Sequence, residues 1–361
     1  MAHVSELTAV ATYGRGGAGA RVRVFEWIDH LGLDAEIFSY LGTSENSPRT
    51  VLERPVATIK VERELRRLER RSPERLLVFR QASPFGHGGL EGRLLAAAGW
   101  GVYDFDDGLA WAAKRRSSLG GLVRSSEEKC LMSLRRADRV IAGNDFLAEW
   151  SSGYARDVVT IPSCVQPKEY LEKASYETSD PPRLVWIGSR SGEGYLRRIE
   201  TALLRVHERT GARLSLIGDA SGLFDGPLDE ITERVQWYEG RGERELAEYD
   251  LGLGPLTDDR VSQGKSAYKL LQYGAAALPF VASPVGTAER VAAALGGSLA
   301  ASDGEWVDAI VALLEAPADE RRRAGRAGRE SVETQYSFSS WQSRWLAALD
   351  LRPATEPEPA T

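Results

Sequence analysis

The sequence predicts an α/β protein made of two consecutive doubly wound domains. In the first half of the chain, short apolar runs of strand length alternate with longer amphipathic segments, and the same alternation restarts in the second half. A polar stretch that ends in two adjacent prolines separates the two halves. The chain of 361 residues is also longer than a single core usually supports.

Six apolar runs in the first half predict parallel strands. In chain order they are LTAVATY, AEIFSY, RLLVFR, WGVYDF, RVIAG and VVTIP. The segments between them have the spacing of helices with one apolar face, among them 18–31, 60–71 and 119–137. We therefore expect a first domain over 1–171.

The second half begins after a predicted linker at 172–183, because EKASYETSDPPR has no apolar periodicity and its prolines disfavour helix. The runs RLVWIG, RLSLIG, YDLGLG, LPFVAS and GGSLAA then predict the strands of a second domain over 184–335. The proline- and glutamate-rich end, 351–361, predicts a disordered tail. Two such domains in sequence place a cleft between the carboxyl ends of their strands, where ligands bind.

Composition and charge exclude several classes of protein. The net charge of −6 gives no reason to expect a nucleic acid partner. The two cysteines form no CxxC pair, which excludes a cysteine-rich zinc module and indicates a reducing compartment. No run reaches the ~20 apolar residues of a membrane span, and the first residues lack the features of a signal peptide. We expect a cytoplasmic protein whose contact with a membrane is at most peripheral.

The loop YGRGGAG, at Tyr13–Gly19, follows the first predicted strand and opens a helix. Gly14, Gly16 and Gly19 match the GxGxxG pattern of dinucleotide-binding proteins. The acidic residue that such proteins carry at the end of the second strand is missing, since AEIFSY ends in serine and tyrosine. The loop therefore favours a backbone that approaches a diphosphate or a sugar over an NAD site, and a tight turn without a ligand stays open.

The stretch GKS, at Gly264–Ser266, resembles the end of a P-loop, but the glycine that this motif needs five positions earlier is Asp259. We expect a helix from about Lys265, whose free N–H groups and positive dipole end attract anions. Lys265 and Lys269 would stand one turn apart there, and they are two of only seven lysines in the chain. The pattern predicts a cradle for a diphosphate, with a solvated helix start as the alternative.

A family resemblance connects these features. The segment 250–286, which contains GKSAYKLLQYG and ends in SPVG, closely resembles the donor-binding segment of family 4 glycosyltransferases, retaining enzymes of the GT-B fold. WIGSRS, at Trp186–Ser191, is similar to the first strand and loop of their nucleotide-binding domain, and Gly16–Gly17 to their loop over the donor phosphates. YSFSSW, at Tyr336–Trp341, resembles the start of the helix with which such chains cross back to the first domain, here 336–350.

The resemblance implies a GT-B fold with two Rossmann-like domains that face a central cleft. The second domain would bind a nucleotide-diphosphate sugar, with UDP, GDP or dTDP as the nucleotide. The first would bind an acceptor that is a small molecule, a glycan or a lipid-linked molecule. Such enzymes generally need no metal ion or other cofactor. The alanine-, arginine- and glycine-rich composition is typical of GC-rich bacterial genomes, where these enzymes modify natural products or envelope polymers.

The resemblance also implies a set of donor-binding residues: Gly16, Gly17, Ser189, Arg190, Gly264, Lys265, Ser266, Lys269 and Gln272. Many family members carry two glutamates eight positions apart in the donor segment, and these positions are Gly264 and Gln272 here. Gln272 can still hydrogen-bond a ribose diol. Gly264 offers no side chain, so the sugar would be held by backbone N–H groups or by another residue.

The stretch VYDFDDGL carries three carboxylates, Asp104, Asp106 and Asp107, within and just after an apolar strand. An Asp-x-Asp pattern can hold Mg²⁺ or Mn²⁺ through hard oxygen ligands. The resemblance instead aligns Asp106 with a histidine that reaches the active site in relatives. It implies that Asp106 and Asp107 contact sugar hydroxyls or act as a base for the acceptor. Capping of the following turn and metal binding remain alternatives.

Two groups of residues complete the predicted site. The residues assigned to catalysis are Asp106, Asp107, Lys269 and Arg190, and the acceptor-side candidates are Arg21, His87 and Asp104. A salt bridge on the helix face is the alternative for Arg21, and an exposed loop position is the alternative for His87.

Other functions remain possible on the same fold. One is an NDP-sugar epimerase or a pseudo-glycosyltransferase, which joins a cyclitol without forming an ordinary glycoside. Another is a non-catalytic sugar-nucleotide-binding protein, which the missing side chain at Gly264 favours. An NAD-dependent enzyme is a further hypothesis, based on the glycine loop alone.

The helix predicted at 60–71, KVERELRRLERR, is basic and amphipathic. Such a helix can dock on an anionic membrane. Glu62, Glu64 and Glu69 dilute its charge, so a solvated surface helix is favoured.

Overall fold

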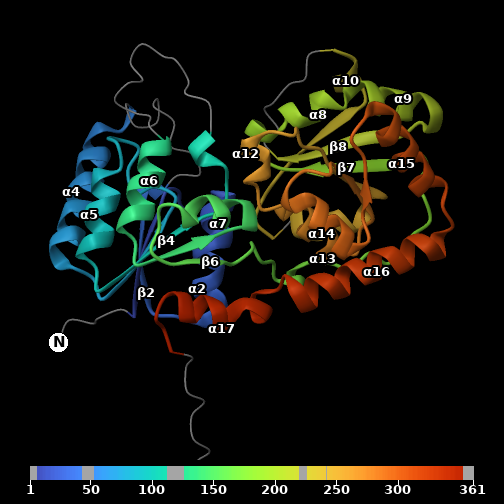
Figure 1. Cartoon of the computed structure of the whole chain (residues 1–361). Helices are drawn as coiled ribbons and strands as arrows, with labels where there is room; N and C mark the ends of the chain where they lie inside the picture. Colours follow the sequence, from blue (N-terminus) through green and yellow to red (C-terminus); the bar gives the residue numbers. More distant parts are fainter. Residues whose placement is uncertain (1–5, 43–52, 112–125, 219–225, 241, 353–361) are drawn as a thin grey trace, which may run out of the picture. The chain divides into compact units, whose positions relative to one another are not determined.

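The structure is a computed structural model that describes residues 6–42, 53–111, 126–218, 226–240 and 242–352 (Figure 1). The chain divides into two compact units. Unit 1 comprises Met1–Ser163 and Trp341–Thr361, and unit 2 comprises Cys164–Ser340. Each unit is built on a six-stranded parallel sheet with flanking helices, which confirms the predicted fold class.

The sheet of unit 1 has the strand order β2-β1-β3-β4-β5-β6, and every pair in it is parallel. Its strands are β1 (Leu7–Ala11), β2 (Ala35–Ser39), β3 (Arg75–Phe79), β4 (Trp100–Phe105), β5 (Arg139–Ala142) and β6 (Val158–Thr160). The order reverses between β1 and β3, and ligands of doubly wound sheets bind at the carboxyl ends of the strands that flank such a reversal.

The helices of unit 1 cover this sheet. They are α1 (Ala18–Ala20), the π-helical turn η1 (Arg21–Phe25), α2 (Glu26–Leu31), α4 (Pro55–Arg71), α5 (Gly89–Ala97), α6 (Ser126–Arg136), α7 (Asp145–Ser152) and α17 (Phe338–Ala348), with short 3-10 turns η2 (Tyr40–Gly42) and η3 (Leu109–Trp111). The predicted helix at 119–137 is described only from Ser126, because 112–125 lie outside the described residues.

Unit 2 repeats the same architecture with the strand order β12-β11-β10-β7-β8-β9, again parallel throughout. Its strands are β7 (Arg183–Ile187), β8 (Arg213–Gly218), β9 (Thr232–Gln236), β10 (Leu251–Gly254), β11 (Phe280–Ala282) and β12 (Ser298–Leu299). The order reverses between β7 and β10. Of the two segments predicted to bind the donor, 186–191 begins at the end of β7 and 250–286 contains β10.

The helices of unit 2 cover its sheet. They are α8 (Gly194–Arg198), α9 (Glu200–Thr210), α10 (Pro227–Glu230), α11 (Gly242–Glu245), α12 (Arg260–Gln263), α13 (Tyr268–Ala275), α14 (Thr287–Leu295), α15 (Asp303–Glu315) and α16 (Ala318–Gln335), with 3-10 turns η5 (Pro167–Glu169), η6 (Arg190–Gly192) and η7 (Leu246–Glu248).

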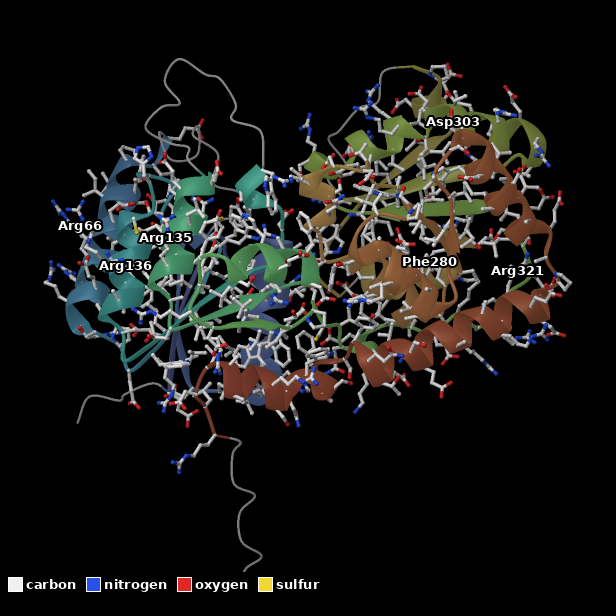
Figure 2. The ribbon with its side chains drawn as sticks, in the orientation of Figure 1. Arg66, Arg135, Arg136, Phe280, Asp303 and Arg321 are labelled. Carbon is white, nitrogen blue, oxygen red and sulfur yellow. The ribbon has the colours of Figure 1, made fainter. Side chains whose placement is uncertain are left out.

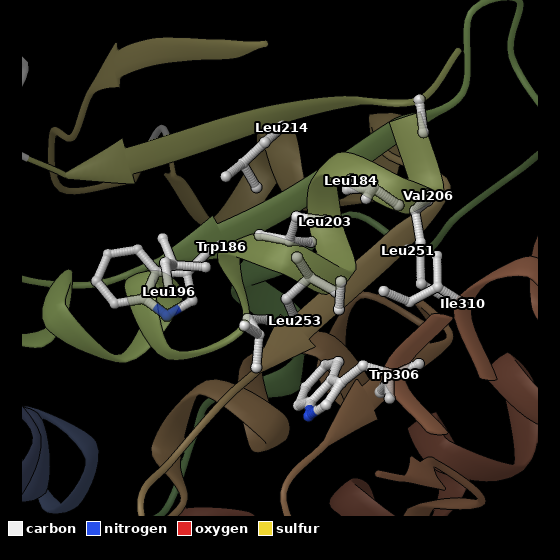
Figure 3. Packing of buried hydrophobic residues seen from close by; sticks show 14 of the residues in the cluster. Leu184, Trp186, Leu196, Leu203, Val206, Leu214, Leu251, Leu253, Trp306 and Ile310 are labelled. Carbon is white, nitrogen blue, oxygen red and sulfur yellow. The ribbon is translucent and has the colours of Figure 1, made fainter. Parts of the chain in front are cut away.

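The core of unit 2 includes a cluster between the sheet and helices α9 and α15 (Figure 3). Leu184 and Leu214 contribute from the strands, Leu203 from α9 and Trp306 from α15. Trp186 belongs to the same cluster and is fully buried, although it stands next to the last residue of β7. It therefore connects the core to the carboxyl edge of the sheet.

The units do not follow the predicted domain ranges residue for residue. The predicted boundary after 171 falls inside unit 2, because Val165 and Tyr170 belong to the hydrophobic core of that unit. The predicted linker also packs against unit 2: the Lys173 N–H donates to the carbonyl of Ala276 at 3.0 Å, and the Tyr176 hydroxyl donates to the carbonyl of Ala277 at 2.8 Å. The buried Tyr176 in this polar stretch was the feature that the linker prediction overlooked.

The final helix belongs to unit 1 from Trp341 onward. The indole ring of Trp345 in α17 stacks on that of Trp27 in α2, with ring centroids 5.1 Å apart and planes inclined by 11°. The predicted tail lies almost wholly outside the described residues, since only Leu351 and Arg352 of it are described. Within the described part of the chain, no helix combines the length and the apolar character that crossing a membrane requires.

Candidate functional site

The glycine loop of unit 1 follows β1 at the point where the strand order reverses. The Thr12 hydroxyl bonds to the carbonyl oxygens of Phe79 and Gln81, at 3.2 and 3.0 Å, and so joins the loop to the end of β3. The loop is a tight turn, in which the Gly17 N–H donates to the carbonyl of Gly14 at 2.9 Å. A Cβ at Gly17 would lie 2.6 Å from the Cβ of Tyr13, so only glycine fits there.

Packing alone explains why position 17 is a glycine. Gly17 is buried, whereas Gly16 is exposed at the tip of the turn. Of the two, only Gly16 offers its backbone to a ligand directly. The tight-turn interpretation therefore accounts for Gly17, and the proposed contact with the donor rests on Gly16.

Arg80 is a residue of this edge that sequence reasoning missed. It follows β3 in the left-handed backbone region, with φ of 58°. Its Nε and Nη2 donate to Oδ1 of Asp106 at 2.9 and 2.6 Å, and Nη2 lies 3.7 Å from Oδ2 of Asp107. Burial lowers the pKa of Arg80, but the charges of Asp106 and Asp107 outweigh this and raise it. The guanidinium stays charged and holds both carboxylates at the carboxyl end of β4.

Asp106 is mostly buried and Asp107 is partly exposed. A Cβ added at Gly19 in α1 would lie 3.1 Å from Nη2 of Arg80, so the start of the first helix also packs on this guanidinium. The structure thus brings the glycine loop, Arg80 and the two aspartates together in unit 1. The pairing of β3 with β4 aligns Phe79 with Asp104. Arg80 follows Phe79 directly, so its place near the aspartates could have been predicted from the fact that neighbouring strands end side by side.

Asp104 was predicted to face the acceptor, and the structure contradicts this. Its side chain is 0% exposed and accepts two bonds from Arg23, from Nε at 3.0 Å and from Nη2 at 2.8 Å. Nη1 of Arg23 donates to the carbonyl of Ile161 at 2.8 Å. Burial raises the pKa of Asp104 to about 6, against the lowering effect of Arg23. Asp104 is still part of β4, and every residue of this strand after Trp100 is buried.

The other acceptor-side candidates are also tied to neighbours. Arg21 is buried in η1, and its Nη1 lies 2.8 Å from Oε1 of Glu26, so the helix-face salt bridge is what the structure shows. His87 is exposed, and its Nδ1 lies 2.6 Å from Oε2 of Glu128. The exposed-loop alternative therefore describes His87.

Among the described residues, no group of three or more His, Cys, Asp or Glu side chains is arranged to hold a metal ion. Asp104 and Asp106 are neighbours in sequence but are paired with different arginines. An Asp-x-Asp metal site needs both carboxylates turned toward one ion. Instead, Asp104 accepts hydrogen bonds from Arg23, and Asp106 accepts them from Arg80.

In unit 2, the end of β7 passes into an exposed turn. The Gly188 N–H donates to the carbonyl of Ile217 at 3.0 Å, and a Cβ at Gly218 would lie 2.4 Å from the Gly188 oxygen. Ser189 and Arg190 follow, both exposed, and Arg190 begins the 3-10 turn η6. The close approach of the ends of β7 and β8 keeps this turn at the carboxyl edge of the sheet.

Both predicted lysines lie against aromatic rings of this edge. The Lys269 Nζ lies 4.9 Å from the centroid of the Trp186 ring, and a Cβ at Gly188 would lie 3.0 Å from the Lys269 Cε. The Lys265 Nζ lies 5.9 Å from the centroid of the Tyr195 ring in α8. Each ammonium group therefore interacts with an aromatic face on the β7 side, so the two predicted donor segments meet.

The helix predicted from about Lys265 begins later than expected. A short helix, α12, comes first, and Gly264 caps its carboxyl end. Ala267 then adopts the left-handed region with φ of 53°, and α13 begins at Tyr268. Lys265 and Ser266 consequently lie in the bend between two helices, and only Lys269 stands in a first helical turn. The expected one-turn spacing of the two lysines on one helix is wrong.

Gln272, the predicted ribose ligand, is buried in α13, and its Nε2 donates to the hydroxyl of Tyr170 at 3.2 Å. A ribose diol would have to compete with this hydrogen bond. The SPVG loop closes the same region, because a Cβ at Gly286 would lie 2.9 Å from the Cα of Gln263. The Ser283 hydroxyl accepts from the Leu256 N–H at 3.0 Å, which joins the loops after β10 and β11.

Solved structures match the chain over almost its full length. HepE from Anabaena, in complex with UDP-glucose, is 14% identical with a TM-score of 0.66 and matches 95% of this chain and 100% of its own. WaaG, a glycosyltransferase involved in lipopolysaccharide biosynthesis, is 16% identical with a TM-score of 0.64, over 95% and 99% of the two chains. The chain has the GT-B fold. The lipopolysaccharide outer core galactosyltransferase WaaB also matches, at 13% identity and a TM-score of 0.59 over 95% and 99% of the chains.

These matches confirm the fold that the resemblance implied. A comparison with models of known protein families gave no match, and a comparison with curated protein sequences gave none either. At identities of 13 to 16% the likeness establishes the fold, and the activity has to be argued from this chain's own residues.

Proposed function

We propose that this protein is a retaining glycosyltransferase that moves a sugar from a nucleotide-diphosphate sugar to an acceptor hydroxyl. The observation that carries the proposal is the convergence of Lys269 and Lys265 on the carboxyl edge of the unit 2 sheet, beside the exposed turn at Ser189 and Arg190. Two ammonium groups, a guanidinium and an exposed turn suit a diphosphate. The shared fold with a structure that holds UDP-glucose supports the same placement.

These groups would serve the leaving diphosphate. When the bond between the anomeric carbon and the diphosphate oxygen breaks, the electron pair stays with the diphosphate and its negative charge grows. Lys269 and Lys265 lie where they can stabilise that charge, and Arg190 extends from the adjacent turn. Preorganised cations of this kind usually supply the largest part of the rate enhancement. Trp186 holds the Lys269 ammonium in place through its buried ring.

Unit 1 would act on the acceptor through Asp106 and Asp107. Arg80 fixes Asp106 by two hydrogen bonds, while Asp107 is more exposed and only 3.7 Å from the same guanidinium. A carboxylate can accept hydrogen bonds from a sugar hydroxyl with either oxygen. We assign hydroxyl recognition to Asp107 first, because Asp106 already accepts from Arg80.

Retention of configuration follows from front-face attack. The acceptor oxygen bonds to the anomeric carbon on the face that the diphosphate leaves, and the acceptor proton passes to the departing diphosphate. No covalent enzyme intermediate is required. The expectation comes from the family resemblance, and the absence of a residue that stands out as a nucleophile agrees with it.

Turnover tests the proposal. The protein is incubated with UDP-, GDP- and dTDP-sugars, alone and with small-molecule, glycan and lipid-linked acceptors, and release of the nucleoside diphosphate is measured. One donor should release its diphosphate, and NMR should show the original anomeric configuration in the product. Lys269→Ala should lower kcat about 10²- to 10³-fold, as loss of one stabilising group does in other enzymes. Lys168→Ala, at an exposed lysine of η5, is the control and should have no effect.

The same experiment separates the alternatives. Nucleotide binding without any turnover would support a non-catalytic binding protein, which Gly264 favours, since it only caps α12 and brings no side chain to the donor. Diphosphate release without a glycosylated acceptor would favour an epimerase. If no donor is bound or consumed, the proposed function is wrong.

A further inference from the structure

Two charged side chains are buried in unit 1, although neither belongs to the residues assigned to the donor or the acceptor. Glu91 in α5 is 0% exposed and Lys129 in α6 is 1% exposed, and the Lys129 Nζ lies 3.9 Å from Oε1 of Glu91. The other charged residues of α6 are exposed, among them Arg135 and Arg136, which Figure 2 labels. A buried ion pair stabilises a fold little in comparison with apolar side chains of the same volume. Stability alone therefore does not account for this pair.

In the described part of the chain, every hydrogen bond of the Glu91 side chain goes to the loop that follows β3. Its Oε1 accepts from the N–H of Ala82 at 3.1 Å and from the N–H of Ser83 at 3.2 Å. The Lys129 Nζ donates to the carbonyl of Ser83, so both partners of the ion pair contact the same residue. Among the described residues, Oε2 of Glu91 has no hydrogen-bond partner. The buried carboxylate thus holds two consecutive backbone N–H groups.

The loop that Glu91 holds begins with a strained turn. The Gln81 N–H donates to the carbonyl of Phe79 at 2.8 Å, which is the hydrogen bond of a γ-turn with Arg80 at its centre. A φ of 58° at Arg80 makes this the rare, strained form of the turn. Such a backbone persists only where its surroundings hold it, and glycine would adopt it more easily. An arginine at this position therefore indicates that its side chain is needed there, and this side chain binds Asp106.

Hydrogen bonds on both sides keep the turn in this conformation. Before it, the Arg80 N–H donates to the carbonyl of Asp104 at 2.9 Å. After it, Glu91 fixes the second and third residues that follow Arg80. The Ser83 hydroxyl also donates to Glu62 of α4, but this contact leaves the two backbone N–H groups to Glu91. Without the carboxylate the backbone could relax the strain, and the Arg80 guanidinium would lose the aspartates that it holds.

We propose that Glu91 is a positioning residue for the acceptor side of the site. By holding two N–H groups of the loop, it keeps the turn at Arg80 in the conformation that aims the guanidinium at Asp106. Asp107 lies 3.7 Å from the same guanidinium, so Glu91 orients both carboxylates without touching the acceptor. Lys129 balances the charge of Glu91 inside the unit. The consequence for sugar transfer rests on the proposed function, whereas the positioning of Arg80 does not.

A matched pair of double variants isolates the backbone contact. Glu91→Leu alone would leave the Lys129 charge buried without a partner, which destabilises strongly, so both variants carry Lys129→Met. Combined with Glu91→Gln, it keeps an acceptor oxygen for the two N–H groups. Combined with Glu91→Leu, it removes that oxygen. A single change, Glu91→Asp, keeps the ion pair but withdraws the carboxylate from the loop by one methylene group. Circular dichroism and a thermal melt show which variants are folded.

NMR of the Arg80 side chain measures the positioning without any substrate. The Arg80 Nε–H, which donates to Oδ1 of Asp106 at 2.9 Å, should give a signal that exchanges slowly with water. Its absence from the spectrum of Arg80→Lys identifies it. The signal should persist in the Glu91→Gln double variant. In the Glu91→Leu double variant and in Glu91→Asp it should exchange about ten-fold faster, as the loss of one or two neutral hydrogen bonds predicts.

Turnover separates positioning from a merely structural role. In the Glu91→Leu double variant, kcat/KM for the acceptor should fall about 10²-fold, the effect of a small misplacement of a catalytic group. The Gln double variant should lose far less, and both should bind the nucleoside diphosphate with unchanged Kd, because unit 2 holds it. The proposal is overturned if the two double variants behave alike in exchange and in turnover, or if nucleotide binding falls together with turnover. If the unaltered protein consumes no donor, the proposed function is wrong, while the NMR comparison still decides the role of Glu91.

Discussion

Loss of the buried ion pair between Arg23 and Asp104 should destabilise unit 1 strongly. Both side chains are 0% exposed, and the pair is joined by two hydrogen bonds of 3.0 and 2.8 Å. Asp104→Asn keeps the shape of the side chain but leaves the Arg23 charge buried without its counter-charge. Breaking a buried pair in this way costs about 3–5 kcal/mol. We therefore expect a loss of about that size in the free energy of unfolding.

The pair also matters for the site. Arg23 stands in η1, directly behind the glycine loop, and Asp104 stands two residues before Asp106. The pair therefore fixes the first helix to the end of β4 from inside the unit. A third bond, from Arg23 to the Ile161 carbonyl at 2.8 Å, adds the segment after β6 to this anchor.

Urea-induced unfolding at pH 7.5, followed by circular dichroism, measures the effect, and hydrogen exchange in β4 assigns it to unit 1. Arg93→Gln is the control, because the Arg93–Glu69 pair is largely exposed and such pairs contribute about 0–1 kcal/mol. The double replacement Arg23→Met with Asp104→Leu should lose less than either single change, since no charge is left unpaired. If Asp104→Asn costs no more than Arg93→Gln, the account of this pair is wrong.

Two further predictions concern single residues. Trp186→Leu removes the ring that holds Lys269 and should weaken binding of the preferred nucleoside diphosphate about 2- to 30-fold in calorimetry, whereas Trp306→Leu, in the same core, should lower stability without that effect. Arg80→Gly should be about 1 kcal/mol more stable to urea than Arg80→Ala, because φ at this position is 58°; equal stability would contradict this.

The sequence predicted the fold well because parallel strands are apolar on both faces. Runs such as RLLVFR and RLVWIG stand out from their surroundings, and each became a strand, β3 and β7. The strand β9, with the sequence TERVQ, was missed. It lies at the edge of the unit 2 sheet and is only partly buried, so its polar residues conceal it.

The site was harder to predict because the positions of its residues depend on tertiary contacts. Nothing local distinguishes Arg23, which is fully buried, from the many exposed arginines of the chain. The left-handed conformation of Ala267 interrupts what the sequence presents as one helix, so Lys265 was placed on the wrong element. Lys269 nevertheless lies against Trp186 of β7, and Lys265 lies against Tyr195 of α8.

The position of Arg80 could have been predicted from the sequence. It follows a predicted strand next in order to the one that carries the aspartates, and the ends of neighbouring parallel strands meet. The individual residues of the glycine loop could not be separated in this way. The roles of Gly16 and Gly17 differ only through their packing, which no local pattern encodes.

The most direct test of the donor site in unit 2 is thermal stabilisation by UDP, GDP, dTDP and ADP, each in EDTA and in Mg²⁺, beside NADH. A ligand at 100 times its Kd stabilises the folded state by about 2.7 kcal/mol, which is a rise of roughly 5–10 °C in Tm for a unit of this size. We predict that one nucleoside diphosphate gives this rise equally in EDTA, that Lys269→Ala removes most of it, and that NADH has no effect. A shift with NADH alone, a shift that needs Mg²⁺, or a shift that Lys269→Ala leaves unchanged would contradict the account.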